Sequence, residues 1–302
     1  MQASDINQQC QAVKENAGFC LLADWAVISL TGPDRKSFLH GMVSNEVNKL
    51  RAGQSNYSLL LTAKGKIVAD AWVYMREEDI LLIARAPLRE IILQTLDKFL
   101  IMEEAEIHDL TQQHAVIALQ GPNAGNMMEQ PDCLVIPAAL TGQPGGLLVC
   151  PQDAREAVQT ALLDAGAHLV SPEVLDILRI EAGVPMVGRE LDDHVIPQEA
   201  GLHHAISFEK GCYIGQEVVA RLHFRGHVNR ELTRFVLECK EPPTETALIQ
   251  HEGKDVGTIT SACRSIEREQ VIGLGYLRSA LRKPGAYYTS LIGDNEITVT
   301  VL

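Results

Sequence analysis

The chain has 302 residues, with 26 basic and 39 acidic side chains, a formal net charge of −13 and 46% hydrophobic residues. This is the composition of a folded globular protein, and it excludes disorder, collagen and coiled coil as the main architecture. The acidic balance argues against broad, sequence-independent binding of nucleic acid, which requires a basic surface. At about 100–200 residues per domain, the length predicts two or three domains.

The sequence shows no segment that would insert into a membrane. No stretch approaches the ~18 consecutive apolar residues of a transmembrane helix, and residues 1–15 are polar and lack the apolar centre of a signal peptide. The cysteines are odd in number and scattered, with no Cys-x-x-Cys pair, which argues against a disulfide framework and against a local zinc site. We therefore expect a cytoplasmic protein with reduced thiols, no bound metal and no membrane contact.

The first hundred residues predict alternating strands and helices. Residues 20–30 are apolar and β-prone, and Thr31 or Asp34 is the candidate N-cap of the helix that follows. Residues 88–100 keep the i, i+3, i+4 spacing of an amphipathic helix. Between these segments, an antiparallel meander is predicted from the β-prone residues 56–62, 67–75 and 80–84.

An Ile-x-Leu-x-Gly-Pro pattern at residues 28–33 recurs at residues 117–122. In both places apolar residues run into a Gly-Pro turn, as they do where a strand gives way to a helix. We interpret the recurrence as two related α+β units side by side, because two copies are too few for a solenoid. The alternative is that Gly-Pro is common after any strand.

The second half of the chain predicts two helices followed by strands. The helices are expected at residues 153–165 and 172–182, the second beginning after Ser171 as N-cap and ending at Gly183. From residue 230 onward, short β-prone segments separated by Gly and Pro predict a small antiparallel barrel or sandwich. The expected domains are therefore 1–110, 111–229 and 230–302.

Glu181 continues the apolar stripe of the helix expected at residues 172–182. An unpaired carboxylate on a buried face costs several kcal/mol, and the negative end of the helix dipole adds repulsion. A cation, backbone donors or the N–H groups of a ligand must therefore compensate it. The structural alternative is an ion pair with Arg179 or Arg189.

Residues 203–230 form the one locally basic strip of the chain, with four of its ten histidines and with Lys210 and Arg225 among its cations. Such a strip suits a carboxylate or phosphate ligand, and the alternative is a solvated cationic face. No acid or thiol stands at a recognised metal spacing from these histidines. Cys212 follows Lys210 and precedes a helix expected from Gly215 onward, which favours its thiolate form. The alternative is an inert, buried cysteine.

The segment Lys-Gly-Cys-Tyr-Ile-Gly-Gln-Glu at residues 210–217 resembles the motif of the YgfZ family of folate-binding proteins, relatives of a mitochondrial iron–sulfur assembly factor. Similar segments follow the family's order along nearly the whole chain: Asp24-Trp25-Ala26, Ala63-Lys64-Gly65-Lys66, residues 179–185, residues 197–202 and Phe224-Arg225-Gly226-His227. The wider superfamily is that of the glycine-cleavage T-protein, a tetrahydrofolate-dependent aminomethyltransferase. The resemblance implies a three-lobed ring of two related α+β lobes and a C-terminal antiparallel β-barrel, with a folate site in its centre.

The resemblance also implies which residues contact tetrahydrofolate, or a one-carbon-substituted form of it. Glu181 is expected to face the pterin ring, Trp25 to lie near the folate, and Lys210 to meet its glutamate tail. Glu199 and Arg225 stand in matching segments and are expected as further folate-binding residues. Ligand N–H groups at Glu181 would supply the compensation that its buried position demands.

Asp70 and Cys212 carry two different functional hypotheses. Cys212 stands in a motif that the transferases lack, and it favours a folate-binding accessory protein that assembles or maintains iron–sulfur enzymes. Its partners would be those enzymes or cluster-assembly proteins, and it would support tRNA modification without touching nucleic acid. The alternative is a folate-dependent one-carbon transferase or demethylase, in which Asp70 is the acid–base group nearest the reacting nitrogens.

Two departures from the transferases weaken the enzyme hypothesis. Ala69 stands where they often have a second Asp, and Leu81 stands where they often have a folate-contacting Tyr. A third possibility is a folate-binding scaffold with no chemistry of its own, which an inert Cys212 would allow.

Overall fold

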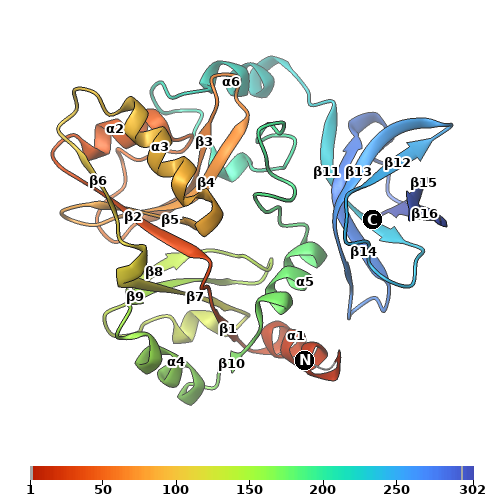
Figure 1. Cartoon of the computed structure of the whole chain (residues 1–302), viewed down its shortest axis with the longest axis horizontal. Helices are drawn as coiled ribbons and strands as arrows, with labels where there is room; N and C mark the ends of the chain where they lie inside the picture. The colour runs from red at the N-terminus through yellow and green to blue at the C-terminus, as the bar shows by residue number, and fades with distance from the viewer. Residues whose placement is uncertain (1–2, 294) are drawn as a thin grey trace.

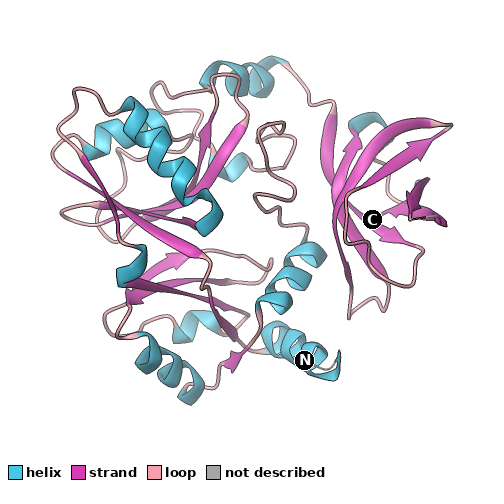
Figure 2. Cartoon of the chain, viewed as in Figure 1, coloured by secondary structure: helices cyan, strands magenta, loops and turns pink. Residues whose placement is uncertain are grey.

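The structure, a computed structural model, describes residues 3–293 and 295–302 and arranges the chain in three lobes (Figure 1). Two lobes are each built on a five-stranded sheet, and the third is a closed six-stranded barrel (Figure 2). The predicted fold class, two α+β lobes and a C-terminal antiparallel barrel, is confirmed. None of the described helices has the length and hydrophobicity needed to span a bilayer.

The first sheet is antiparallel and has the strand order β3-β4-β5-β2-β6. Its strands are β2 (Trp25–Thr31), β3 (Ser55–Leu61), β4 (Ile67–Met75), β5 (Ile80–Arg85) and β6 (Glu106–Asp109). One face is covered by α2 (Arg35–Met42) and α3 (Arg89–Phe99), whose Leu39, Ile92 and Leu96 pack into one apolar cluster with it. Because successive side chains of a strand point to opposite faces of the sheet, the residues between these buried ones point from the other face toward the centre of the molecule.

The second sheet has the order β10-β1-β7-β9-β8 and contains the N-terminal strand. Its strands are β1 (Gly18–Leu21), β7 (His114–Gln120), β8 (Leu134–Pro137), β9 (Gly145–Pro151) and β10 (His168–Leu169). The helix α4 (Arg155–Asp164) packs on this lobe through Val158 and Leu162, close to the expected residues 153–165.

The single strand expected at residues 20–30 is two strands in different sheets. Strand β1 pairs with β7 and β10, whereas β2 pairs with β5 and β6. The helix α1 (Ala3–Glu15), which the sequence analysis did not predict, precedes β1. The expected first domain at residues 1–110 is thus corrected: residues through Leu21 belong with the second sheet, because the long-range pairing of β1 places them there.

The two Gly-Pro turns occupy equivalent places in the two sheets. Strands β2 and β7 each lie between two antiparallel partners, and each runs into a glycine with positive φ, Gly32 at 93° and Gly121 at 133°. After Gly32 the chain forms α2, whereas after Gly121 it forms only the short 3-10 helix η3 (Ala124–Met127). The sequence repeat therefore corresponds to a repeated strand and turn, followed by different helices.

The helix α5 (Pro172–Ala182) lies with α1 between the second lobe and the barrel (Figure 1). It ends at Gly183, whose φ of 77° is the left-handed conformation that glycine adopts readily. Ser171 occupies the N-cap position as predicted, but its side chain makes no capping hydrogen bond. Four further short 3-10 helices connect elements: η1 (Ala86–Leu88), η2 (Thr111–Gln113), η4 (His203–Ala205) and η5 (Ser279–Leu281).

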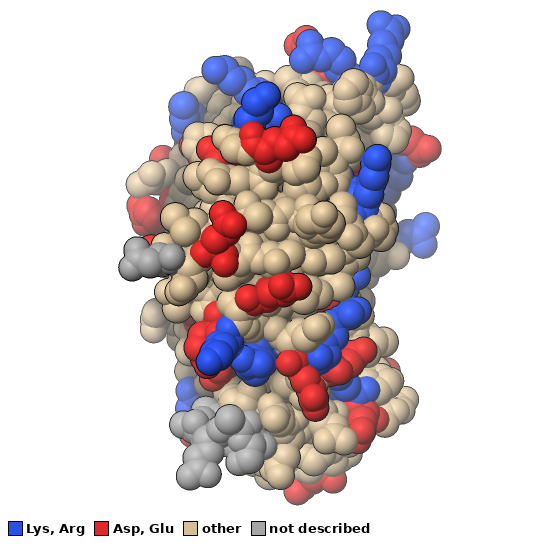
Figure 3. Space-filling view, turned by 90° about the vertical axis from the view of Figure 1, so that its right-hand side faces the viewer, with Lys and Arg blue, Asp and Glu red and all other residues tan. Residues whose placement is uncertain are grey.

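The barrel begins at Arg230 and closes in the order β11-β14-β13-β12-β15-β16. Its strands are β11 (Arg230–Leu237), β12 (Ala247–His251), β13 (Lys254–Arg264), β14 (Val271–Arg278), β15 (Tyr287–Ile292) and β16 (Asn295–Val301). Acidic and basic side chains are interspersed on the face seen in Figure 3, in keeping with the equal numbers of each in residues 201–302.

Residues 191–219 pack on the first lobe and not on the second. Leu191, Val195 and Leu202 form one buried cluster with Leu59 and Ile67 of β3 and β4. The segment ends in α6 (Gln216–Arg225), which begins after a glycine as predicted. The expected second domain at residues 111–229 is therefore corrected, because these apolar residues find their partners on the outer part of the first sheet.

Replacing Gly32 by Ala should destabilise the protein more than replacing Gly53 by Ala. Both glycines have positive φ, but a Cβ at Gly32 would lie 2.3 Å from the carbonyl oxygen of Glu104, whereas a Cβ at Gly53 meets nothing within 4 Å. We expect Gly32→Ala to lower the free energy of unfolding by about 1–3 kcal/mol more than Gly53→Ala, measured by urea denaturation. Equal losses would show that backbone strain alone, and not the close approach, sets the effect.

Candidate functional site

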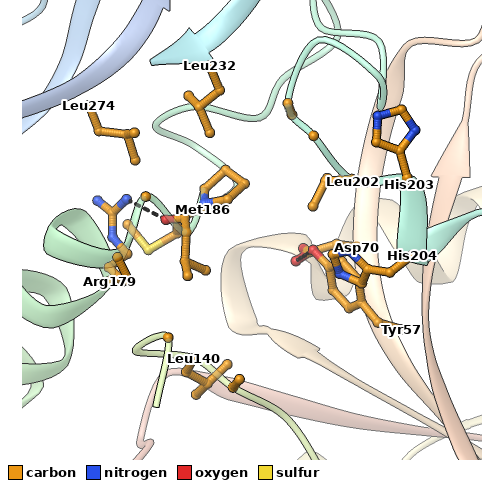
Figure 4. A pocket seen from close by; sticks show the side chains of 18 of the residues that line it. Tyr57, Asp70, Leu140, Arg179, Met186, Leu202, His203, His204, Leu232 and Leu274 are labelled. Carbon is orange, nitrogen blue, oxygen red and sulfur yellow. Dashed lines mark hydrogen bonds between the residues drawn. The ribbon is translucent and has the colours of Figure 1, made fainter. Parts of the chain in front are cut away.

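A cavity of about 800 Å³ lies where the three lobes meet. Its walls come from the central face of the first sheet, residues 137–142 of the second lobe, the end of α5, residues 198–204 and the barrel strand β11. Figure 4 shows Tyr57, Asp70 and His204 on one side of it and Arg179 and Leu274 on the other. This volume suits a small organic ligand.

Asp70, on β4, turns its carboxyl group toward the cavity (Figure 4). The Tyr57 hydroxyl donates a hydrogen bond to Oδ2 of Asp70 at 2.7 Å, whereas Oδ1 is buried without a hydrogen-bond partner. Burial raises the pKa of Asp70 above its usual value, and the Tyr57 hydrogen bond and the nearby Arg85 charge oppose that rise. A buried carboxyl group with a raised pKa and one free oxygen suits proton exchange or a hydrogen bond with a ligand.

Aromatic rings in contact form the wall beside Asp70. The ring of Tyr57 lies 4.7 Å from that of Trp72 and 5.7 Å from that of His204, and all three residues line the cavity. Trp25 lies behind this layer, 5.4 Å from Trp72 and 4% exposed, and does not line the cavity. Trp25 thus packs against the cavity wall without lining the cavity, and its place near folate stays a prediction.

The sequence analysis missed Tyr57, Trp72 and His204. The two strand residues had a usable signal, because Asp70 and Trp72 are two apart on one strand and so share a face of the sheet. Tyr57 lies directly opposite Trp72 in the antiparallel pairing of β3 and β4. His204 had no such signal, since it reaches the cavity from the short 3-10 helix η4.

Glu199 lines the cavity, as the sequence analysis expected, and is 9% exposed. Its Oε2 accepts a hydrogen bond from the backbone N–H of Ile196 at 3.0 Å, and its Oε1 lies 3.3 Å from Nε of Arg230. Glu199 therefore fixes its own loop against the start of β11, and its contact with folate remains a prediction.

Glu181 points away from the cavity, which corrects the expectation that it faces a pterin ring. Its carboxylate forms an ion pair with Nζ of Lys14 at 2.7 Å and accepts hydrogen bonds from the Ser265 hydroxyl and the backbone N–H of Ile266. The compensation that burial demands thus comes from α1 and from the barrel. Arg179 is not the partner, because its guanidinium binds Asp176 and Glu190.

Lys210 is buried in a backbone cage, and this corrects its expected role at the folate tail. Its ammonium group donates to the carbonyl oxygens of His40, Val43 and Asn45 at 2.5, 2.6 and 2.8 Å. An ammonium group has three N–H donors, so these bonds use all of them. Burial lowers the pKa of Lys210 to about 8. Lys210 therefore anchors its own segment to the end of α2.

Cys212 and Arg225 lie outside the cavity. Cys212 is exposed, on the segment that Lys210 anchors, and Arg225 is the last residue of α6. The same segment packs on the turn between β3 and β4, since a Cβ at Gly215 would lie 2.5 Å from the carbonyl oxygen of Thr62. The expected contact of Arg225 with folate is corrected: the cavity is lined by His203 and His204 at the start of the basic strip and not by Cys212 or Arg225.

No group of three or more His, Cys, Asp or Glu residues is arranged to hold a metal ion in the described part of the chain. The chemistry that the cavity offers is therefore that of Asp70, the aromatic wall and the arginines around them.

Comparisons with known proteins agree with this architecture. The GCVT N-terminal domain family matches residues 2–132, and the glycine cleavage T-protein C-terminal barrel domain family matches residues 230–302. The aminomethyltransferase of Geobacillus kaustophilus is 30% identical, covering 92% of this chain and 84% of its own, and that of Halothermothrix orenii is 26% identical, covering 100% and 91%. The chain belongs to the glycine-cleavage T-protein family.

A solved structure extends the agreement to the whole fold. The aminomethyltransferase T of the glycine cleavage system from Bartonella henselae superposes with a TM-score of 0.86 at 22% identity, over 98% of this chain and 88% of that one. The likeness covers both lobes and the barrel, so the three-lobed arrangement around the cavity is that of the family.

Replacing Lys210 by Met should destabilise the protein without changing the cavity. The variant leaves three carbonyl oxygens without their donor, and we expect a loss of roughly 1–3 kcal/mol in the free energy of unfolding. The exposed Lys64, replaced in the same way, is the control and should change stability little.

The effect of Lys210→Met should also depend on pH. The folded-state pKa of about 8 lies below the usual 10.5, so the folded chain releases this proton before the unfolded chain does. The wild type should therefore gain stability relative to the variant as the pH rises from about 8 toward 10.5. A difference that stays constant over this range would contradict the buried ammonium.

Proposed function

We propose that this protein binds tetrahydrofolate in the central cavity, with its ring system against Tyr57, Trp72 and His204. The observation that carries the proposal is the free Oδ1 of buried Asp70 beside this aromatic wall. An unpaired buried acceptor calls for a donor, and a reduced pterin has several N–H groups. Flat aromatic side chains favour stacking of a flat heterocycle.

One-carbon transfer is the activity that the comparisons support. The relatives at 30% and 26% identity are named aminomethyltransferases. Tetrahydrofolate, when bound, supplies the nitrogen atoms that accept a one-carbon unit. In this role Asp70 would hold or move a proton at those atoms, and burial raises its pKa toward the range in which a carboxyl group exchanges protons at neutral pH.

Replacing Asp70 by Asn tests this role, because the amide keeps the shape and loses the proton exchange. We expect methylene transfer from an amine donor to tetrahydrofolate to fall by roughly 10²–10⁴-fold, with tetrahydrofolate affinity changing much less. Because the folded state raises the pKa of Asp70, ionising this carboxyl group costs more in the folded than in the unfolded chain, and the protein loses stability as the pH rises through the usual pKa of an aspartate. The melting temperature of the ligand-free variant should therefore equal or exceed that of the wild type.

Two results would contradict the transferase proposal in different ways. Unchanged transfer by Asp70→Asn would remove Asp70 from the chemistry. Absence of transfer by the wild type over a panel of amine donors, with tight tetrahydrofolate binding, would leave a folate-binding protein with another role.

That other role is an accessory function for iron–sulfur enzymes, and the position of Cys212 favours it. The Cys212 thiol is exposed and lies outside the cavity, so a partner protein can reach it while folate is bound. One cysteine cannot hold a cluster, which takes about four protein ligands, so a partner would supply the rest. Ala69 and Leu81, which depart from the transferases, weaken the competing transferase hypothesis.

Replacing Cys212 by Ala in cells that lack the wild-type protein tests the accessory role. We expect the variant to fail to restore the activity of iron–sulfur enzymes and the cluster-dependent modification of tRNA, because the thiol is its point of contact. Cys239→Ala, on the partly exposed barrel cysteine, is the matched control and should restore both. Full recovery with Cys212→Ala would refute a role for this thiol, while unchanged tetrahydrofolate affinity would show that the cavity is intact.

A further inference from the structure

Arg85 and Asp70 lie near one another on neighbouring strands of the first sheet. Strands β4 and β5 are antiparallel, with Trp72 paired to Ile83. Asp70 precedes Trp72 by two residues on β4 and Arg85 follows Ile83 by two residues on β5, just past the end of this pairing, and both residues line the cavity. A cation and an anion placed in this way usually form an ion pair.

These two charged groups instead turn to other partners. The Asp70 carboxyl group accepts the Tyr57 hydroxyl, and the Arg85 guanidinium lies over the Trp25 ring, 5.5 Å from its centre. No hydrogen bond or ion pair joins the Arg85 side chain to another described residue. This cation–π contact holds the guanidinium beside Trp25 and leaves its N–H groups free for a ligand.

The other arginines of the cavity wall differ from Arg85 in this respect. Arg179 donates to Glu190 at 2.8 Å, Arg282 to Glu231 at 2.9 Å, and Arg234 to the backbone oxygen of Glu181 at 2.7 Å. Arg85 is thus the cavity arginine whose five N–H donors all lack a protein acceptor within the described chain. The Arg85 side chain is partly exposed in the cavity, so an acceptor from a ligand can replace water at these N–H groups.

We propose that Arg85 forms a carboxylate-binding subsite in the cavity, next to Asp70. The planar fork of a guanidinium matches the two oxygens of a carboxylate, and the free Oδ1 of Asp70 accepts an N–H from the same or an adjoining ligand. Two ligands carry this chemistry: the glutamate tail of tetrahydrofolate, and a small amino acid that shares the cavity with it. The first source rests on the proposed function, and the second does not.

Tryptophan fluorescence reports on this subsite directly. The chain has two tryptophans, Trp25 under the Arg85 guanidinium and Trp72 beside it in the cavity wall. We would titrate the full chain with tetrahydrofolate, with 6-methyltetrahydropterin, which has no glutamate tail, and with glycine and N-methylglycine. The variants are Arg85→Met, which keeps an apolar stem on Trp25, and Arg85→Lys, which keeps the charge.

A matched control is Arg282→Met, which removes a cavity arginine that already has Glu231 as its partner. We expect Arg85→Met to lower the affinity for at least one carboxylate ligand tenfold or more. Arg85→Lys should restore part of this affinity, and Arg282→Met should lower it less than Arg85→Met does. The affinity for 6-methyltetrahydropterin should stay unchanged. A loss for tetrahydrofolate assigns the subsite to the glutamate tail, and a loss confined to the amino acids assigns it to a separate ligand.

Three outcomes would overturn the subsite: wild-type affinity of Arg85→Met for every carboxylate ligand, an equal loss for 6-methyltetrahydropterin, or no binding of any ligand to the wild type. Thermal denaturation of each variant shows whether it is folded, and a variant that does not fold is replaced by Arg85→Gln. The proposed function fails separately, when neither folate compound binds the wild type and the amino acids still bind in an Arg85-dependent way.

Discussion

The position of the barrel depends on one buried carboxylate, that of Glu190. Its side chain is fully buried and accepts hydrogen bonds from Arg179 of α5 and from the hydroxyl groups of Thr260 and Ser261 of β13, while its backbone oxygen accepts the Tyr276 hydroxyl. A buried charge is tolerated only when donors surround it. These donors come from α5 and from the barrel, so satisfying Glu190 holds the barrel wall of the cavity in place.

This arrangement separates two places at which the protein can act. Asp70 and Arg85 face the enclosed cavity, where a small ligand loses its water and meets fixed charges. Cys212 lies on the outside, on a segment fixed by the Lys210 ammonium to the end of α2. The exposed thiol and the cavity are thus separate features of the same chain.

Glu181 and Lys210 show why the resemblance named residues that the structure uses otherwise. The sequence correctly indicated that Glu181 is partly buried and needs compensation, but its partner Lys14 stands on a helix that the sequence analysis did not predict. Lys210 was expected to meet an anion, and three backbone carbonyl oxygens take its place. Local sequence patterns indicate that a polar side chain is buried, whereas its hydrogen-bonding partner depends on packing between segments far apart in the chain.

The sequence by itself determined most strands and helices, the barrel at residues 230–302 and the end of α5 at Gly183, because periodicity and turn residues act over a few neighbours. The resemblance of the sequence to the family also indicated Asp70 as a candidate acid–base residue. Only the tertiary structure decided that β1 joins the second sheet and that Trp25 packs against Trp72 of the cavity wall. The pairing of β4 with β5 brought Arg85 near Asp70. Strand register and lobe packing depend on contacts between distant residues, and no local pattern encodes them.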